Sequence, residues 1–112
     1  GTADITMAAA GQATSAAPLP VTKCVLVRYE YVENILEKRA PFRSDHIAHW
    51  MPLADNGQLL LGGATDPPAG AYLILHGVPR EEIVDLIASD PYVKNALVTS
   101  HEILDWNVVI GA

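Results

Sequence analysis

The chain has 112 residues, enough for one small domain, and its 13 acidic against 7 basic residues give a formal net charge of -6. Nucleic acids and anionic membranes are bound by clustered Lys and Arg, and no basic run occurs here, so neither is an expected partner. No apolar stretch approaches the roughly twenty residues that a membrane span requires, and the single cysteine, Cys24, excludes an internal disulfide and fits a reducing, cytoplasmic location.

Residues 1–20 are predicted to be a flexible tail, because they are rich in Ala, Gly, Ser, Thr and Pro and show no hydrophobic period. Met7 is interpreted as the natural initiator, which makes residues 1–6 an addition from cloning. The patterned remainder, residues 21–112, is predicted to be one domain.

The first half of this domain predicts a strand followed by a helix. From Val21 a β-branched run alternates apolar and polar side chains, which predicts a strand that ends near residues 29–31. A polar, irregular stretch then leads to a helix with Ser44 as its expected N-cap and apolar residues at helical spacing. Asn56-Gly57 is the expected end of this helix.

The second half predicts a hairpin, a second helix and a long last strand. Residues 58–64 and 71–77 read as antiparallel strands joined by a turn that contains two prolines. Pro79 and the acidic residues after it favour the start of a helix, which Asp90-Pro91 ends because the residue before proline avoids the helical region. A final strand is predicted over residues 97–110.

The resulting order, β-α-β-β-α-β, is typical of the ferredoxin-like fold, an α+β architecture with a four-stranded antiparallel sheet. Two helices can cover only one face of such a sheet. The other face would expose more apolar surface than soluble monomers usually tolerate. We therefore expect a homodimer that buries this face, with the long last strand as the arm that clasps the partner.

Element order also gathers the candidate site residues at one end of the sheet. The start of the first helix and the end of the second share this rim with the ends of the first two strands and the starts of the last two. The residues that fall there are Tyr29, His46, Gly62, Gly63, Tyr72, Asp90, Tyr92 and His101. A His/Asp pair in a small pocket can move a proton near neutral pH, because imidazole titrates there and a carboxylate fixes its tautomer. His46 and Asp90 are therefore the candidate catalytic pair.

Candidate substrate-binding residues on or near the same rim are Arg43, Gly63, Tyr92, Tyr72 and His101. Arg43 is either solvated or binds an anionic oxygen through its planar donor fork. Tyr92 either packs with a satisfied hydroxyl or acts as an acid. Gly63 permits a turn, lets a ligand approach the backbone, or does both.

No metal site and no cofactor are expected. His46 and His49 share a helix face loosely and His101 can reach the same rim, but no cysteine cluster or His-Glu-x-x-His motif completes a zinc site. Gly62-Gly63-Ala64 lacks the spacing of a phosphate loop, and no Gly-x-Ser-x-Gly elbow indicates a serine hydrolase.

Several motifs in the right order resemble the YCII-related (YciI-like) family. They are an Arg-x-x-His start to the first helix, Asn56-Gly57 and Gly62-Gly63 around a short strand, Asp90-Pro91-Tyr92, and the ending over residues 102–111. The resemblance covers about residues 21–111 and implies a dimeric ferredoxin-like α+β barrel with a His/Asp pair, matched here by His46 and Asp90. One member class of this family is a dehydrochlorinase acting on chlorinated hydroxyhydroquinones. Residues 33–39 and Pro52 depart from the pattern, so substrate identity does not transfer.

The sequence thus predicts a small dimeric, cofactor-free lyase, dehydrochlorinase or isomerase-like enzyme. Asp90 would accept a hydrogen bond from one imidazole nitrogen of His46, and the other nitrogen would abstract or return a proton on a small cyclic or enolisable molecule. Arg43 or backbone amides near Gly63 would stabilise the developing oxyanion. Two alternatives stay open: a non-catalytic domain that binds a small ligand, and a purely structural dimerisation module.

Overall fold

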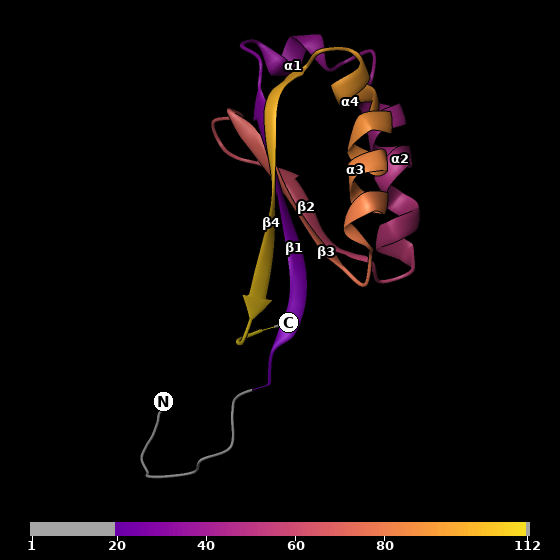
Figure 1. The fold of residues 1–112 in the computed structure, drawn as a ribbon. Coiled ribbons are helices and arrows are strands. Elements are labelled where there is room, and N and C mark those ends of the chain that lie inside the picture. Colours follow the sequence, from indigo (N-terminus) through magenta and orange to yellow (C-terminus); the bar gives the residue numbers. More distant parts are fainter. Residues whose placement is uncertain (1–19, 112) are drawn as a thin grey trace.

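The computed structural model describes residues 20–111, which form a single four-stranded antiparallel sheet with helices on one side (Figure 1). The predicted tail, apart from Pro20, and the proposed initiator Met7 lie outside the described residues. Within the described part of the chain, no helix has both the length and the apolar character that crossing a bilayer requires.

The strands are β1 (Thr22–Tyr31), β2 (Leu59–Ala64), β3 (Gly70–His76) and β4 (Val98–Val108). They lie in the order β2-β3-β1-β4, and every neighbouring pair is antiparallel. This order confirms the predicted ferredoxin-like α+β fold, in which the first and third strands are central and the second and fourth form the edges.

The two main helices are α2 (Arg43–Asp55) and α3 (Arg80–Ser89), and both lie on the same face of the sheet (Figure 1). Two short helices were not predicted: α1 (Ile35–Lys38), in the stretch expected to be irregular, and α4 (Pro91–Lys94), directly after α3. The prediction of Ser44 as N-cap is wrong, because the helix begins at Arg43 and Phe42, two residues before Ser44, is the cap. No side chain caps this end of α2 by a hydrogen bond.

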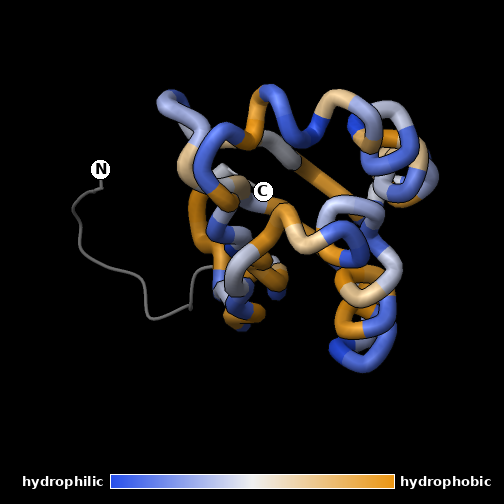
Figure 2. The backbone as a smooth tube through the Cα atoms, turned by 90° about the horizontal axis from the view of Figure 1, so that it is seen from above, coloured by the Kyte–Doolittle hydropathy of each residue, from blue (hydrophilic) through white to orange (hydrophobic). Residues whose placement is uncertain are grey.

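The core lies between the helices and the covered face of the sheet. Alternate residues of β1 and β3 point into it and are buried with side chains of the helices, among them Val27, Leu75, Ile83 and Ile87. Seen from above, the helical parts of the tube alternate between hydrophobic and hydrophilic residues (Figure 2), as expected for helices that bury one side only.

The opposite face of the sheet carries no helix (Figure 1). Strand register aligns one apolar residue from each strand into a row across this face, namely Leu61, Ile74, Leu26 and Leu104. Both ends of the row are open to solvent, since Leu61 is 69% and Leu104 46% exposed. We call these four residues the open-face row.

Candidate functional site

The centre of the site is the carboxylate of Asp90, which is completely buried in the described structure. Its oxygens accept four hydrogen bonds, two each. Oδ1 faces His46 Nδ1 at 2.7 Å and the Tyr92 backbone N–H at 2.9 Å. Oδ2 accepts from the Tyr29 hydroxyl at 2.9 Å and the Trp50 indole N–H at 2.8 Å. Four accepted hydrogen bonds fill the acceptor sites that an ionised carboxylate offers.

Local sequence explains why Asp90 occupies this position. Pro91 cannot follow a helical residue without strain, so α3 ends and Asp90 takes an extended conformation with φ -63° and ψ 125°. The same residue is the N-cap of α4, because its side chain accepts the Tyr92 N–H while Pro91 occupies the first helical turn. One residue thus ends one helix, starts the next and turns its carboxylate into the core.

Electrostatics keep Asp90 ionised despite its burial. Burial favours the neutral acid and raises the pKa, but the hydrogen bonds from His46 and Trp50, the charge of His46 and the Tyr92 N–H together outweigh it, so the pKa of Asp90 lies below its usual value. Since an ionised carboxylate can only accept hydrogen bonds, Nδ1 of His46 carries a hydrogen. The other ring nitrogen, Nε2, is left free for a ligand.

Tyr92 provides a second contact that orients the imidazole of His46. The two rings are stacked, with centroids 3.7 Å apart and planes 4° from parallel. The His46 side chain is 16% exposed, whereas Asp90 beneath it has no exposed surface. His46 is thus the solvent-facing member of the pair.

Two tyrosines around Asp90 remain protonated over the physiological range. Burial, and secondly the negative charge of Asp90, raise the pKa of Tyr29 far above its ordinary value. Burial and the neighbouring Tyr92 raise the pKa of Tyr31 to about 12, although Arg39 and Arg43 oppose that rise. The Tyr29 hydroxyl therefore remains a donor to Asp90, and the Tyr31 hydroxyl, which lines the cavity, keeps its hydrogen for a ligand.

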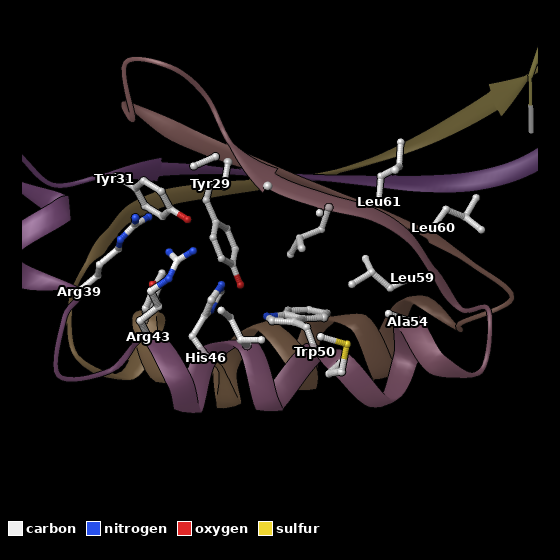
Figure 3. Close-up of a pocket in the computed structure, with 18 residues that line it drawn as sticks. Tyr29, Tyr31, Arg39, Arg43, His46, Trp50, Ala54, Leu59, Leu60 and Leu61 are labelled. Carbon is white, nitrogen blue, oxygen red and sulfur yellow. The ribbon is translucent and has the colours of Figure 1, made fainter.

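A cavity of about 460 Å³ opens beside His46, between α2 and the strands β2 and β3 (Figure 3). Its volume lies within the range of small-molecule sites. Six of the residues predicted from sequence line it: Tyr29, Arg43, His46, Gly62, Gly63 and Tyr92. Asp90 contacts His46 from behind the lining.

The structure does not bring Tyr72 or His101 to this cavity. Tyr72 alternates with the buried Ala71 and Leu73 on β3, so its side chain lies on the uncovered face, where it is 43% exposed. His101 lies opposite Tyr29 on the edge strand β4 and is exposed. Reaching the same end of the sheet is thus not sufficient to reach the same pocket.

The lining residues that were not proposed from sequence include Tyr31, Arg39 and Trp50. Trp50 could have been found, because it follows His46 by four positions and so shares its helix face. Arg39 carried no such signal, since it ends the unpredicted helix α1.

The remaining histidines have structural partners. His49 Nε2 lies 2.7 Å from the Leu86 carbonyl and so links α2 to α3, and His76 Nδ1 lies 3.1 Å from the Lys23 carbonyl. Over residues 20–111, no group of three His, Cys, Asp or Glu side chains is placed to hold a metal ion.

Comparison with known proteins agrees with the fold. Residues 23–107 match the family described as YCII-related domain. A similar solved structure is the 5-chloro-2-hydroxyhydroquinone dehydrochlorinase of Burkholderia phenoliruptrix AC1100 in complex with 2,5-dihydroxybenzoquinone. It superposes with a TM-score of 0.65 at 22% identity, over 74% of this chain and 92% of that one. No curated protein sequence matches the chain. At this identity, the structural likeness shows the fold alone.

Proposed function

The chain belongs to the YCII-related domain family, and on this basis we propose that it is a small enzyme that moves a proton on a cyclic or enolisable organic molecule. The observation that carries the proposal is the 2.7 Å contact between His46 Nδ1 and the buried Asp90, beside a cavity of about 460 Å³. A base that is oriented by a carboxylate and open to a pocket is the arrangement that general base catalysis requires.

In the proposed reaction, Nε2 of His46 takes a proton from a carbon next to a carbonyl group. The electrons of the broken C–H bond pass to the carbonyl oxygen, and the negative charge of Asp90 stabilises the imidazolium that forms. Return of the proton to a different carbon gives an isomer. Expulsion of a leaving group such as chloride from the adjacent carbon gives an unsaturated product instead, which is a lyase reaction.

The oxyanion that develops in this reaction needs a hydrogen-bond donor to stabilise it. Gly62 and Gly63 of β2 both line the cavity, so the backbone of this segment lies within reach of a substrate oxygen. We assign oxyanion stabilisation to this segment or to Arg43, which also lines the cavity.

The dehydrochlorinase activity of the structural neighbour favours the lyase version of the proposal. The first substrate to test is therefore 5-chloro-2-hydroxyhydroquinone under exclusion of oxygen, with chloride release as the readout. Cyclic ketones in deuterium oxide form a second panel, with deuterium incorporation next to the carbonyl as the readout. We expect a rate above buffer on at least one panel and its loss in both His46→Ala and Asp90→Asn.

The alternative is a domain that binds a small molecule without transforming it, which the same cavity would serve. Saturable ligand binding with no rate above buffer on either panel would favour it. A measurable rate that is the same in His46→Ala as in the original protein would exclude His46 as the base.

We also propose that the protein is a cytoplasmic homodimer. The open-face row gives each sheet an uncovered apolar surface, and contact with a second copy would remove it from water. The ion pair between Arg28 and Glu102 lies next to this row and would fix the register of the two copies.

A further inference from the structure

The cavity beside His46 has two chemically different ends. Arg39, Arg43 and Tyr31 lie at one end, and Leu59, Leu60 and Ala54 lie at the other, with His46 between them (Figure 3). A ligand that fills the cavity therefore meets charged groups at one end and hydrocarbon at the other.

The charge of the cavity is opposite to the charge of the protein. The chain carries 13 acidic and 7 basic residues, yet two of its four arginines line the cavity and no Asp or Glu does. Among the ion pairs formed within residues 20–111, neither Arg39 nor Arg43 takes part. The cavity lining thus holds two arginines and no acidic side chain in an otherwise acidic molecule, which favours the binding of an anion.

A second observation, on Tyr92, also favours a polar ligand in this cavity. The hydroxyl of Tyr92 is buried and has no hydrogen-bond partner in the described structure, although Tyr92 lines the cavity. Leaving a buried hydroxyl without a partner is costly, so such groups usually meet a ligand or an ordered water. The Tyr31 ring contacts the Tyr92 ring edge-on, with centroids 6.0 Å apart, which places a second phenol in the same corner.

The other end has the character of a hydrocarbon site. Ala54 from α2 lies there with Leu59 and Leu60 from β2 (Figure 3), and Met51 also lines the cavity, whereas no charged side chain is found among the described residues at this end. The total volume of about 460 Å³ admits a single ring with a short side chain.

We propose that this site takes an amphipathic monocarboxylate, a ring or short hydrocarbon that carries one carboxylate group. The carboxylate contacts Arg39 and Arg43, the hydrocarbon contacts Met51 and Leu59, and the carbon between them faces His46. This inference deepens the proposed function and names its substrate class. It leaves the backbone near Gly63 as the oxyanion donor, since Arg43 is engaged by the carboxylate.

The test uses three probes: phenylacetate, its neutral analogue phenylacetamide, and acetate, which has the charge without the ring. Binding to the full chain is followed by the NMR shifts of the Trp50 indole N–H and of backbone amides along α2. We expect phenylacetate to bind at least about tenfold more tightly than either of the other probes, the scale of a hydrogen bond to a charged group. Raising the salt concentration should weaken binding of phenylacetate and leave that of phenylacetamide unchanged.

Variants identify the residues responsible. Arg39→Gln and Arg43→Gln should each reduce the preference for phenylacetate over phenylacetamide severalfold, and the double variant should abolish it. Arg80→Gln is the matched control, because Arg80 is exposed at the start of α3 and does not line the cavity. The Arg80→Gln variant should prefer phenylacetate over phenylacetamide as strongly as the original protein does. An unchanged spectrum of amides outside the cavity verifies folding in each variant.

Equal binding of phenylacetate and phenylacetamide, or no binding of phenylacetate at millimolar concentration, would overturn the inference. Equal binding of acetate and phenylacetate would also overturn it, because the apolar end would then contribute nothing. The inferred substrate class and the proposed reaction can be refuted independently of each other. His46→Ala should retain the preference for the carboxylate, so lack of proton transfer with this preference intact refutes only the reaction.

Discussion

Tyr92 and His46 stack face to face, with ring centroids 3.7 Å apart and ring planes 4° from parallel. The stack fixes the plane of the imidazole, and the hydrogen bond to Asp90 fixes its rotation within that plane. Two independent contacts therefore hold Nε2 in one direction, and they can be removed separately.

Replacing Tyr92 with Phe should keep the stack and remove only a hydroxyl that has no partner in the described structure. We expect a change of less than about 0.5 kcal/mol in the free energy of unfolding for Tyr92→Phe. Tyr92→Ala should cost about 3 to 5 kcal/mol, as for other buried aromatic truncations. Denaturant unfolding measures both. A Phe variant as unstable as the Ala variant would show that the hydroxyl has a partner.

Asp90→Asn should destabilise the protein by about 3 kcal/mol, because an amide nitrogen cannot accept the hydrogen bonds that one carboxylate oxygen now receives. Asp85→Asn is the control, since Asp85 lies on the exposed side of α3. Equal stability of the two variants in denaturant would contradict the view that the four hydrogen bonds to Asp90 hold the core together.

The pH dependence of stability should follow from the same carboxylate. The folded protein holds the pKa of Asp90 below that of the unfolded chain, which is about 3.9. As the pH falls, the Asp90 carboxylate therefore takes up a proton in the unfolded chain before it does so in the folded protein. The stability that ionised Asp90 contributes is fully present above about pH 3.9 and is lost as the pH falls through the folded pKa. The difference in unfolding free energy between the original protein and Asp90→Asn should therefore shrink as the pH falls from about 4 towards 3. A difference that grows over this interval would reverse the sign of the shift.

Gly70 should tolerate no side chain, because a Cβ there would collide with the backbone carbonyl oxygen of Tyr29 on the neighbouring strand. Gly70→Ala should push β3 away from β1 at the residue that donates to Asp90, with a loss of about 2 kcal/mol or more in unfolding free energy. Gly63→Ala is the control, because a Cβ at that position meets nothing within 4 Å. A harmless Gly70→Ala would mean that the two strands separate easily.

The proposed homodimer predicts a mass of twice the 12.0 kDa chain by light scattering at micromolar concentration. Leu104→Lys places a charge in the open-face row and should give monomers. Val84→Lys is a matched control on α3, since Val84 is 48% and Leu104 46% exposed. A monomer before any substitution would refute the dimer.

The sequence was sufficient for the order of the main elements. Strand alternation, Asn56-Gly57 and Asp90-Pro91 mark the boundaries, and each reflects local chemistry that the fold retains. The start of α2 was misplaced, because a serine in the first turn looks like a cap although Phe42 occupies that position. Helix α1 carries no detectable period, since it has four residues and starts after Asn34 in the left-handed conformation.

The position of the candidate site was partly predictable for a physical reason. Element order determines which end of the sheet a residue reaches, and this placed His46 and Asp90 together, 2.7 Å apart in the structure. The face on which a strand residue lies depends on whether its position is odd or even. On β3 both faces carry apolar residues, Leu73 and Leu75 on one and Ile74 on the other. The pattern therefore could not show that Tyr72 faces away from the cavity.

The hydrogen bonds to Asp90 also determine when the site forms during folding. The donors come from β1, α2 and the start of α4, and Tyr29 precedes Asp90 by 61 positions. None of the side-chain donors can reach the carboxylate until the chain beyond α3 has been synthesised and docked, so the site is completed late in folding. The Trp50 indole hydrogen, enclosed at the centre of these bonds, should exchange with deuterium only when the whole domain opens. That single hydrogen therefore reports the global unfolding equilibrium from within the site.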